Sequence, residues 1–249
     1  SEFYVDPCHI QVELDPANQL GRGAGGTVYR AVHRPTNTAL AVKVVPGMDK
    51  EKRSQLINDL RTLLRIPKSS FLIQLYAVYN REGCVHVALE YMDYGSLADV
   101  KKRVHMVPEH ILALIIVQIL EGLKTLHLSN VLHRDVKLPN ILVNSCGMVK
   151  VTDFGISKTL DDSVCDTFVG TMSILSPERM LGEDYSFPAD IWSMGLCVYE
   201  LAAGVYPYNN KTSLPAIFDN LCNKPEPRLP PGRFSPALCD FVACCLQRK

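Results

Sequence analysis

The stretch that decides the fold is HRDVKLPN at residues 133–140, followed by the triplet DFG at residues 153–155. Asp135 supplies a carboxylate that can accept a hydroxyl proton, and Lys137 adds a positive charge two positions later. Asn140 and Asp153 offer the hard oxygen ligands that Mg²⁺ prefers. Phosphoryl transfer needs in-line positioning and charge neutralisation more than covalent chemistry from the protein. The ordered set therefore indicates a phosphoryl-transfer site, because a random polar loop explains any one of these residues but hardly all of them.

Two motifs nearer the N-terminus fit the same chemistry. Residues 21–28 read GRGAGGTV, and such glycines let backbone amides approach a phosphate because no Cβ intervenes. A strand rather than a helix is predicted after them, which argues against a Rossmann site, although a plain hairpin turn would explain the glycines alone. Lys43 lies in the apolar run LAVKVV, where a buried ammonium needs an anionic partner such as a phosphate plus a carboxylate. A solvent-facing strand lysine is the alternative for this motif alone.

Taken in order, the glycine loop, the strand lysine, HRDVKLPN and DFG resemble a eukaryotic protein kinase. The triplet SPE at residues 176–178 stands where that family has its APE signature, and DIWSMG at residues 190–195 resembles the start of its central C-lobe helix. Closer matches are to the MAP kinase kinases: the activation segment from Asp162 to Thr171, and the hinge-like EYMDYGSL at residues 90–97. The resemblance covers the chain from about Leu14 to its end.

This resemblance implies an α+β, two-lobed protein kinase fold, with an N-lobe over residues 1–92 and a C-lobe over residues 93–249. The residue pattern agrees with a β-rich first part and a helical second part. Strands are expected at residues 14–20, 28–32, 40–45, 71–79 and 84–90, and helices at residues 50–66, 109–128, 188–203, 214–223 and 235–246. The helix at residues 109–128 is apolar on most sides, so we expect it to be buried. The family continues with further helices, so the C-lobe is expected to be incomplete at its end.

The resemblance also implies a role for each residue of the site. Asp135 would orient the substrate hydroxyl and accept its proton, while Lys137 would neutralise the transferring phosphoryl group. Lys43 would contact the α and β phosphates of ATP and be held by Asp59. The expected cofactors are ATP and Mg²⁺, with the metal on Asn140 and Asp153. Besides Lys43, the residues expected to contact the nucleotide are Gly21, Arg22, Gly23, Ala24, Gly25, Gly26, Val28, Ala41, Leu89 as gatekeeper, Glu90, Met92, Ser96 and Leu142.

Asp59 departs from the family, which has a glutamate at this position of its C-helix. The aspartate keeps the charge and loses one methylene, a reach deficit of roughly 1.5 Å. A misplacement on that scale can cost about a hundredfold in rate unless the helix packs closer. The nearest glutamate, Glu51, lies about two helical turns away and would point elsewhere.

Ser163 and Thr167 match the spacing of the Ser-x-x-x-Ser/Thr pair that upstream kinases phosphorylate in MAP kinase kinases. Solvated loop hydroxyls are the alternative, but a phosphate there could pair with Arg134 and order the loop. The expected partners are a MAP kinase substrate, phosphorylated on Thr and Tyr of its activation loop, and an upstream MAP kinase kinase kinase. Two other functions stay open: a catalytically weak or silent kinase-fold scaffold, and a serine/threonine kinase outside the MAP kinase cascade.

Composition excludes several classes of protein. Lys plus Arg and Asp plus Glu number 26 each, without the basic surplus of a nucleic-acid binder. The longest apolar run, residues 111–117, is far shorter than the roughly 20 residues that span a bilayer. The nine cysteines form no CxxC pair, so we expect reduced thiols in a cytoplasmic protein and no zinc site. Oligomeric state is not indicated by the sequence.

Overall fold

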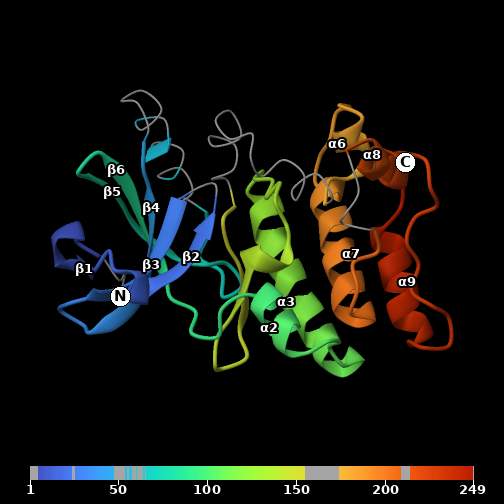
Figure 1. Cartoon of the computed structure of the whole chain (residues 1–249), viewed down its shortest axis with the longest axis horizontal. Helices are drawn as coiled ribbons and strands as arrows, with labels where there is room; N and C mark the ends of the chain where they lie inside the picture. Colours follow the sequence, from blue (N-terminus) through green and yellow to red (C-terminus); the bar gives the residue numbers. More distant parts are fainter. Residues whose placement is uncertain are drawn as a thin grey trace.

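The computed structural model describes residues 5–23, 26–47, 54, 56–57, 60, 64, 66–154, 174–208 and 214–248. A curled antiparallel sheet lies at one end of the molecule, and helices form the other end (Figure 1). The strands of this sheet are β1 (Ile10–Val12), β2 (Gln19–Gly23), β3 (Gly26–His33), β4 (Thr38–Val45), β5 (Leu75–Arg81) and β6 (Cys84–Glu90). Their order is β1-β3-β4-β6-β5, with β2 also paired to β3. This sheet is the β-rich N-lobe that the sequence predicts.

Strand β4 is the centre of this lobe and is buried along most of its length. On one face Val42 and Val44 pack in a cluster with residues of the N-terminal segment, among them Val5. On the other face Val45 packs with Leu56 and Leu60 of the segment that follows. Burial on both faces explains why this strand reads as an almost continuous apolar run rather than as an alternating pattern.

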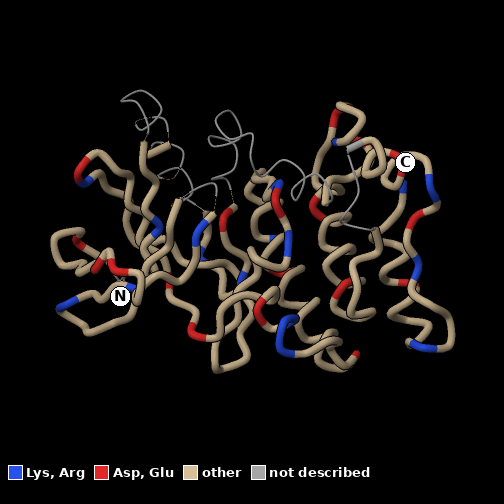
Figure 2. The backbone as a smooth tube through the Cα atoms, in the orientation of Figure 1, with Lys and Arg blue, Asp and Glu red and all other residues tan. Residues whose placement is uncertain are grey.

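The helical lobe is organised around two long helices. Its elements are α2 (Leu97–Arg103), α3 (Glu109–Leu128), α6 (Pro177–Met180), α7 (Pro188–Ala203), α8 (Leu214–Cys222) and α9 (Pro236–Cys245), with the hairpin β7 (Ile141–Val143) and β8 (Val149–Val151). Helix α7 is buried over most of its length and packs between α3 and α9. Trp192 and Leu196 of α7 share one core with Leu123 and Leu126 of α3. Positive and negative residues are interspersed over both lobes (Figure 2).

Helix α3 differs from its sequence expectation. Its bounds agree, but Ile111, Leu114 and Val117 are 41%, 63% and 57% exposed, so the helix is buried on one face only. That face packs on α7 and β8, and no described element covers the other face. Helix α3 is long and apolar enough to cross a membrane, by length and composition only, and one of its faces packs on α7 and β8.

Strand β5 begins at Leu75, four residues later than predicted. The preceding residues bond to β8 instead, because Val151 donates to the Phe71 carbonyl and Ile73 donates to the Val151 carbonyl, each at 2.9 Å. Of the strand predicted at residues 14–20, only Gln19 and Leu20 are in a strand, because a 3-10 turn over Pro16–Asn18 precedes β2. Most of the helix predicted over residues 50–66 lies outside the described residues.

Candidate active site

A cavity of about 660 Å³ lies between the two lobes. Strands β2, β3, β4 and β6 contribute its N-lobe wall, and α2, β7 and the segment after β8 contribute its C-lobe wall. The predicted nucleotide-contacting residues that line it are Gly21, Arg22, Val28, Ala41, Lys43, Leu89, Glu90, Met92, Ser96 and Leu142. Gly23 and Gly26 do not line it, and Ala24 and Gly25 lie outside the described residues.

Three predicted catalytic-loop residues meet at one carboxylate. Lys137 Nζ lies 2.8 Å from Asp135 Oδ2, and Asn140 Nδ2 donates to the same oxygen and to the Asp135 carbonyl, both at 2.9 Å. The other oxygen, Asp135 Oδ1, is buried and has no hydrogen-bond partner among the described residues. One oxygen therefore fixes the carboxylate, and the other keeps its capacity to accept a hydrogen bond.

Asp190, at the start of α7, holds the backbone of this loop. Its Oδ2 accepts from the His133 amide and its Oδ1 from the Arg134 amide, both at 2.9 Å. His127 Nε2 lies 2.9 Å from Oδ2. Burial opposes ionisation of Asp190, but these hydrogen bonds together lower the pKa of its carboxyl below the usual value. The aspartate is 2% exposed, so its charge is kept by His127 of α3 and by the two amides of the loop.

His133 connects this loop to the segment after β8, which carries the second acidic residue, Asp153. Its Nε2 donates to the Thr152 carbonyl at 2.8 Å, which leaves Nδ1 to accept from the Asp135 amide at 3.2 Å. Complete burial lowers the pKa of His133, which favours this neutral form. The ring also meets Phe154 edge to face, with centroids 6.5 Å apart. The positions of Asp135 and of the DFG segment are thus coupled through one buried imidazole.

Lys43 reaches across the cavity to the opposite lobe. Its Nζ lies 2.9 Å from Asp153 Oδ1, and the lysine is 8% exposed. The sequence predicts Asp59 as the partner of this lysine, but Asp59 lies outside the described residues. Asp153 is therefore the carboxylate that the structure places on Lys43, joining β4 to the segment after β8.

Two residues of the site have backbone conformations that are uncommon for side chains other than glycine. The φ angles of Arg134 and Asp153 are 70° and 62°, in the left-handed region. Residues in this region cost roughly 1–3 kcal/mol and persist where the surrounding structure fixes them. Here the fixing contacts are visible: Asp190 accepts from the Arg134 amide, and Lys43 contacts the Asp153 side chain.

The residues present fit a magnesium ion. Asn140 uses its amide nitrogen on Asp135, which leaves its side-chain oxygen for a metal. Asp153 uses Oδ1 on Lys43 and keeps its second carboxylate oxygen. Carboxylate and amide oxygens are hard ligands of the kind Mg²⁺ takes, together with phosphate oxygens and water.

The sequence reasoning missed a charge pair behind the hinge. Lys150 of β8 lies 2.7 and 2.9 Å from the two carboxylate oxygens of Glu90, at the end of β6. It also missed cavity-lining residues, among them Leu20, Thr152 and the α2 cations Lys102 and Arg103. An isolated charge at the end of a strand gives no sequence signal of its partner 60 positions away.

The predicted phosphorylation sites, Ser163 and Thr167, lie outside the described residues. The guanidinium of Arg134 has no ion pair with any residue of the described part of the chain. The Arg134 carbonyl instead accepts from Arg179 Nη1 at 2.7 Å, which joins the catalytic loop to α6.

Comparison with known proteins agrees with this geometry. The sequence matches the protein kinase domain family over residues 14–249. It is 41% identical to mitogen-activated protein kinase kinase 3 of Arabidopsis thaliana, over 95% of this chain and 46% of that protein. It is 36% identical to mitogen-activated protein kinase kinase SIPKK of Nicotiana tabacum (95% and 69%) and 37% identical to mitogen-activated protein kinase kinase 2 of Arabidopsis thaliana (95% and 68%). The chain thus spans about half the length of the first relative and about two thirds of the others. The kinase fold, the geometry of the site and these likenesses agree, and the chain belongs to the protein kinase family, within the group of MAP kinase kinases.

Proposed function

We propose that this chain transfers the γ-phosphoryl group of ATP to hydroxyl groups in the activation loop of a MAP kinase, on threonine and on tyrosine. The observation that carries the proposal is the Oδ1 of Asp135, which has no hydrogen-bond partner among the described residues, while Lys137 and Asn140 hold the other oxygen. An unpartnered carboxylate oxygen beside an ammonium suits a residue that receives a hydroxyl proton while negative charge moves past the lysine.

In this proposal each described residue has a distinct task. Asp135 aligns the substrate hydroxyl and takes its proton on its carboxylate. Lys137 lies beside the developing charge, and Lys43 faces the phosphates from the N-lobe. Mg²⁺, held by Asn140 and Asp153, would supply neutralisation of the phosphate charge. Walls from both lobes line the cavity in which the nucleotide would bind.

The specificity for MAP kinases rests on the relatives compared above, which are named as mitogen-activated protein kinase kinases. Activation by an upstream kinase at Ser163 and Thr167 rests on their spacing in the sequence. A Ser163→Ala/Thr167→Ala variant is expected to show no increase in turnover after treatment with the upstream kinase. Equal activation of the variant and the original chain would refute this part.

The test of the main proposal incubates the chain, with Ser163→Asp and Thr167→Asp, with ATP, Mg²⁺ and a panel of kinase-dead MAP kinases. Mass spectrometry then locates the phosphates, with Asp135→Asn as the matched inactive control. We expect phosphate on both Thr and Tyr of one activation loop, absent with the control. Phosphate on serine peptides without need for a folded MAP kinase would favour a kinase outside the cascade. ATP binding without any transfer would favour a scaffold, and recovery of transfer by Asp59→Glu would attribute that loss to the C-helix geometry.

A further inference from the structure

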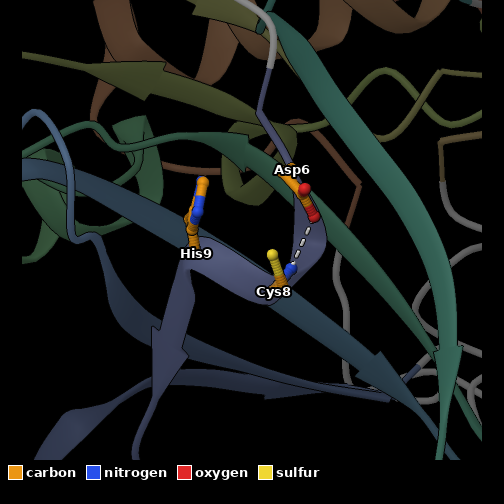
Figure 3. A group of neighbouring side chains, drawn as sticks. All are labelled: Asp6, Cys8 and His9. Atoms are coloured by element: carbon orange, nitrogen blue, oxygen red, sulfur yellow. Dashed lines mark hydrogen bonds between the residues drawn. The ribbon is translucent and has the colours of Figure 1, made fainter.

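The N-terminal turn before β1 carries three metal-ligating side chains, remote in the fold from the active site. The 3-10 helix η1 (Pro7–His9) begins directly after Asp6 and ends where β1 starts. One ligand atom each from Asp6, Cys8 and His9 lie within 4.8 Å of one another (Figure 3). A carboxylate oxygen, a thiol sulfur and an imidazole nitrogen are thus gathered around a single turn.

The backbone of this turn is fixed by its own hydrogen bonds. Asp6 accepts twice, with its side chain from the Cys8 amide and with its carbonyl from the His9 amide, both at 2.9 Å. The Pro7 carbonyl accepts from the amide of Ile10, and the pyrrolidine ring of Pro7 restricts φ. The ligand-bearing residues therefore keep their relative positions without a metal, and only side-chain rotation is needed to adjust the donors.

The turn is also anchored at both ends to the sheet. Val5 and Ile10 are 1% and 3% exposed and pack in the core on the outer face of the N-lobe. Arg81 of β5 donates to the Pro7 carbonyl at 3.3 Å, and the Arg34 amide donates to the His9 carbonyl at 3.0 Å. Between these buried anchors the Cys8 and His9 side chains are exposed, so an ion can reach them from solvent.

We propose that Asp6, Cys8 and His9 form a binding site for a divalent transition-metal ion, and that Zn²⁺ is the ion that suits this donor set. Zinc binds Cys sulfur at about 2.3 Å and His nitrogen or carboxylate oxygen at about 2.0–2.2 Å in tetrahedral geometry. Tetrahedral angles then place the donor atoms about 3.4–3.6 Å apart. The three ligand atoms are up to 4.8 Å apart in the structure, and rotation of the exposed side chains would shorten these separations to that range. A fourth position stays open for water or another ligand.

The donor set also determines which ions this site prefers. A thiolate is a soft ligand and favours zinc or copper, while Mg²⁺ and Ca²⁺ favour oxygen donors alone. The Cys8 amide holds one oxygen of Asp6, an outer contact of the kind that orients a ligating carboxylate. The sequence predicts no zinc site because it contains no CxxC pair. Asp6, Cys8 and His9 instead supply three donors within four consecutive residues.

The test uses the full chain under reducing conditions, without nucleotide, titrated with Co²⁺ as a spectroscopic substitute for Zn²⁺. A Co²⁺–thiolate charge-transfer band is expected at one equivalent and should disappear when Zn²⁺ is added. No cysteine lines the described cavity between the lobes, so Co²⁺ bound there would not produce this band. Calorimetric titration with Zn²⁺ alone then gives the affinity of each variant.

Cys8→Ser is expected to abolish the band, and His9→Gln to weaken Zn²⁺ binding at least tenfold. The matched controls are Cys146→Ser and His110→Gln, an exposed thiol and an exposed imidazole in the other lobe, and both should bind as the original chain does. Thermal unfolding of the metal-free variants checks that each is folded. A band that survives Cys8→Ser, the absence of saturable binding, or unchanged Zn²⁺ affinity in His9→Gln would each overturn the proposal.

Discussion

Replacement of Lys150 by methionine tests whether the charge pair behind the hinge stabilises the joint between the lobes. Lys150 on β8 contacts both oxygens of Glu90, at the end of β6, at 2.7 and 2.9 Å. One of these oxygens also accepts from the Gln74 amide at 3.3 Å. The Lys150 and Glu90 side chains are only 12% and 22% exposed, so solvent screens the pair poorly.

The magnitude follows from this partial burial. Exposed ion pairs contribute about 0.2–1 kcal/mol. Removal of one partner from a fully buried pair costs about 3–5 kcal/mol, because the other charge is left without compensation. For Lys150→Met we therefore expect a loss of about 2 kcal/mol in the free energy of unfolding. For a chain of this size that corresponds to a fall in Tm of about 4–8 °C.

The assay is a double-mutant cycle by thermal and denaturant unfolding, with Lys150→Met, Glu90→Gln and the double variant. The matched control is Lys102→Met, which breaks the ion pair between Lys102 and Asp99. The side chain of Lys102 is 77% exposed and that of Asp99 is 43% exposed. The control should change stability by less than about 1 kcal/mol. A coupling energy between Lys150 and Glu90 below about 0.5 kcal/mol would refute the reasoning, since that is the additivity expected of independent sites.

Three further predictions concern single residues. Burial lowers the pKa of His86 below its usual 6.5, so the unfolded chain takes up a proton first and stability falls as pH drops below about 6.5. His86→Phe should therefore reduce the dependence of the unfolding free energy on pH between pH 7 and pH 5. An unchanged pH slope would contradict this. Asp190→Asn should lower the free energy of unfolding, measured with denaturant, by about 1–3 kcal/mol, because a loop amide loses its acceptor. It should lower kcat while the KM for ATP changes less. Unchanged stability would contradict this role. Gly26→Ala should weaken ATP binding measured by calorimetry, because φ is 120° there and a Cβ would lie 2.2 Å from the Val44 carbonyl oxygen; unaltered affinity would mean that the turn can rearrange.

The elements with strong periodic or apolar patterns were predictable from sequence. The bounds of α3, α7 and β6 agree with the prediction, because each has a long run that is buried on at least one side and clear breaking residues at its ends. The short strand β1 was not predicted. It has only three residues and is held by pairing to β3, a contact that its own residues do not encode.

The types of residue in the candidate site were predictable because they fall in compact motifs, but their contacts were not. Lys43 meets Asp153 from 110 positions away, and Asp190 meets the amide of Arg134 from 56 positions away. Such pairings depend on how the lobes and helices pack, which local spacing does not determine. For the same reason the exposed face of α3 was predicted to be buried. The apolar character of a side chain does not show that another element packs on it.

Gly122 shows how the core positions the site through the backbone. This glycine lies on the buried face of α3, and a Cβ there would lie 2.8 Å from the Phe71 carbonyl oxygen and 3.3 Å from Val151 Cγ2. That carbonyl accepts from the Val151 amide, so the missing side chain lets α3 approach the place where the N-lobe segment joins β8. Asp153 follows Val151 by two residues, and its left-handed backbone then directs its carboxylate to Lys43. The position of Asp153, which holds Mg²⁺ in our proposal, is thus set partly by a glycine in the core of the helical lobe.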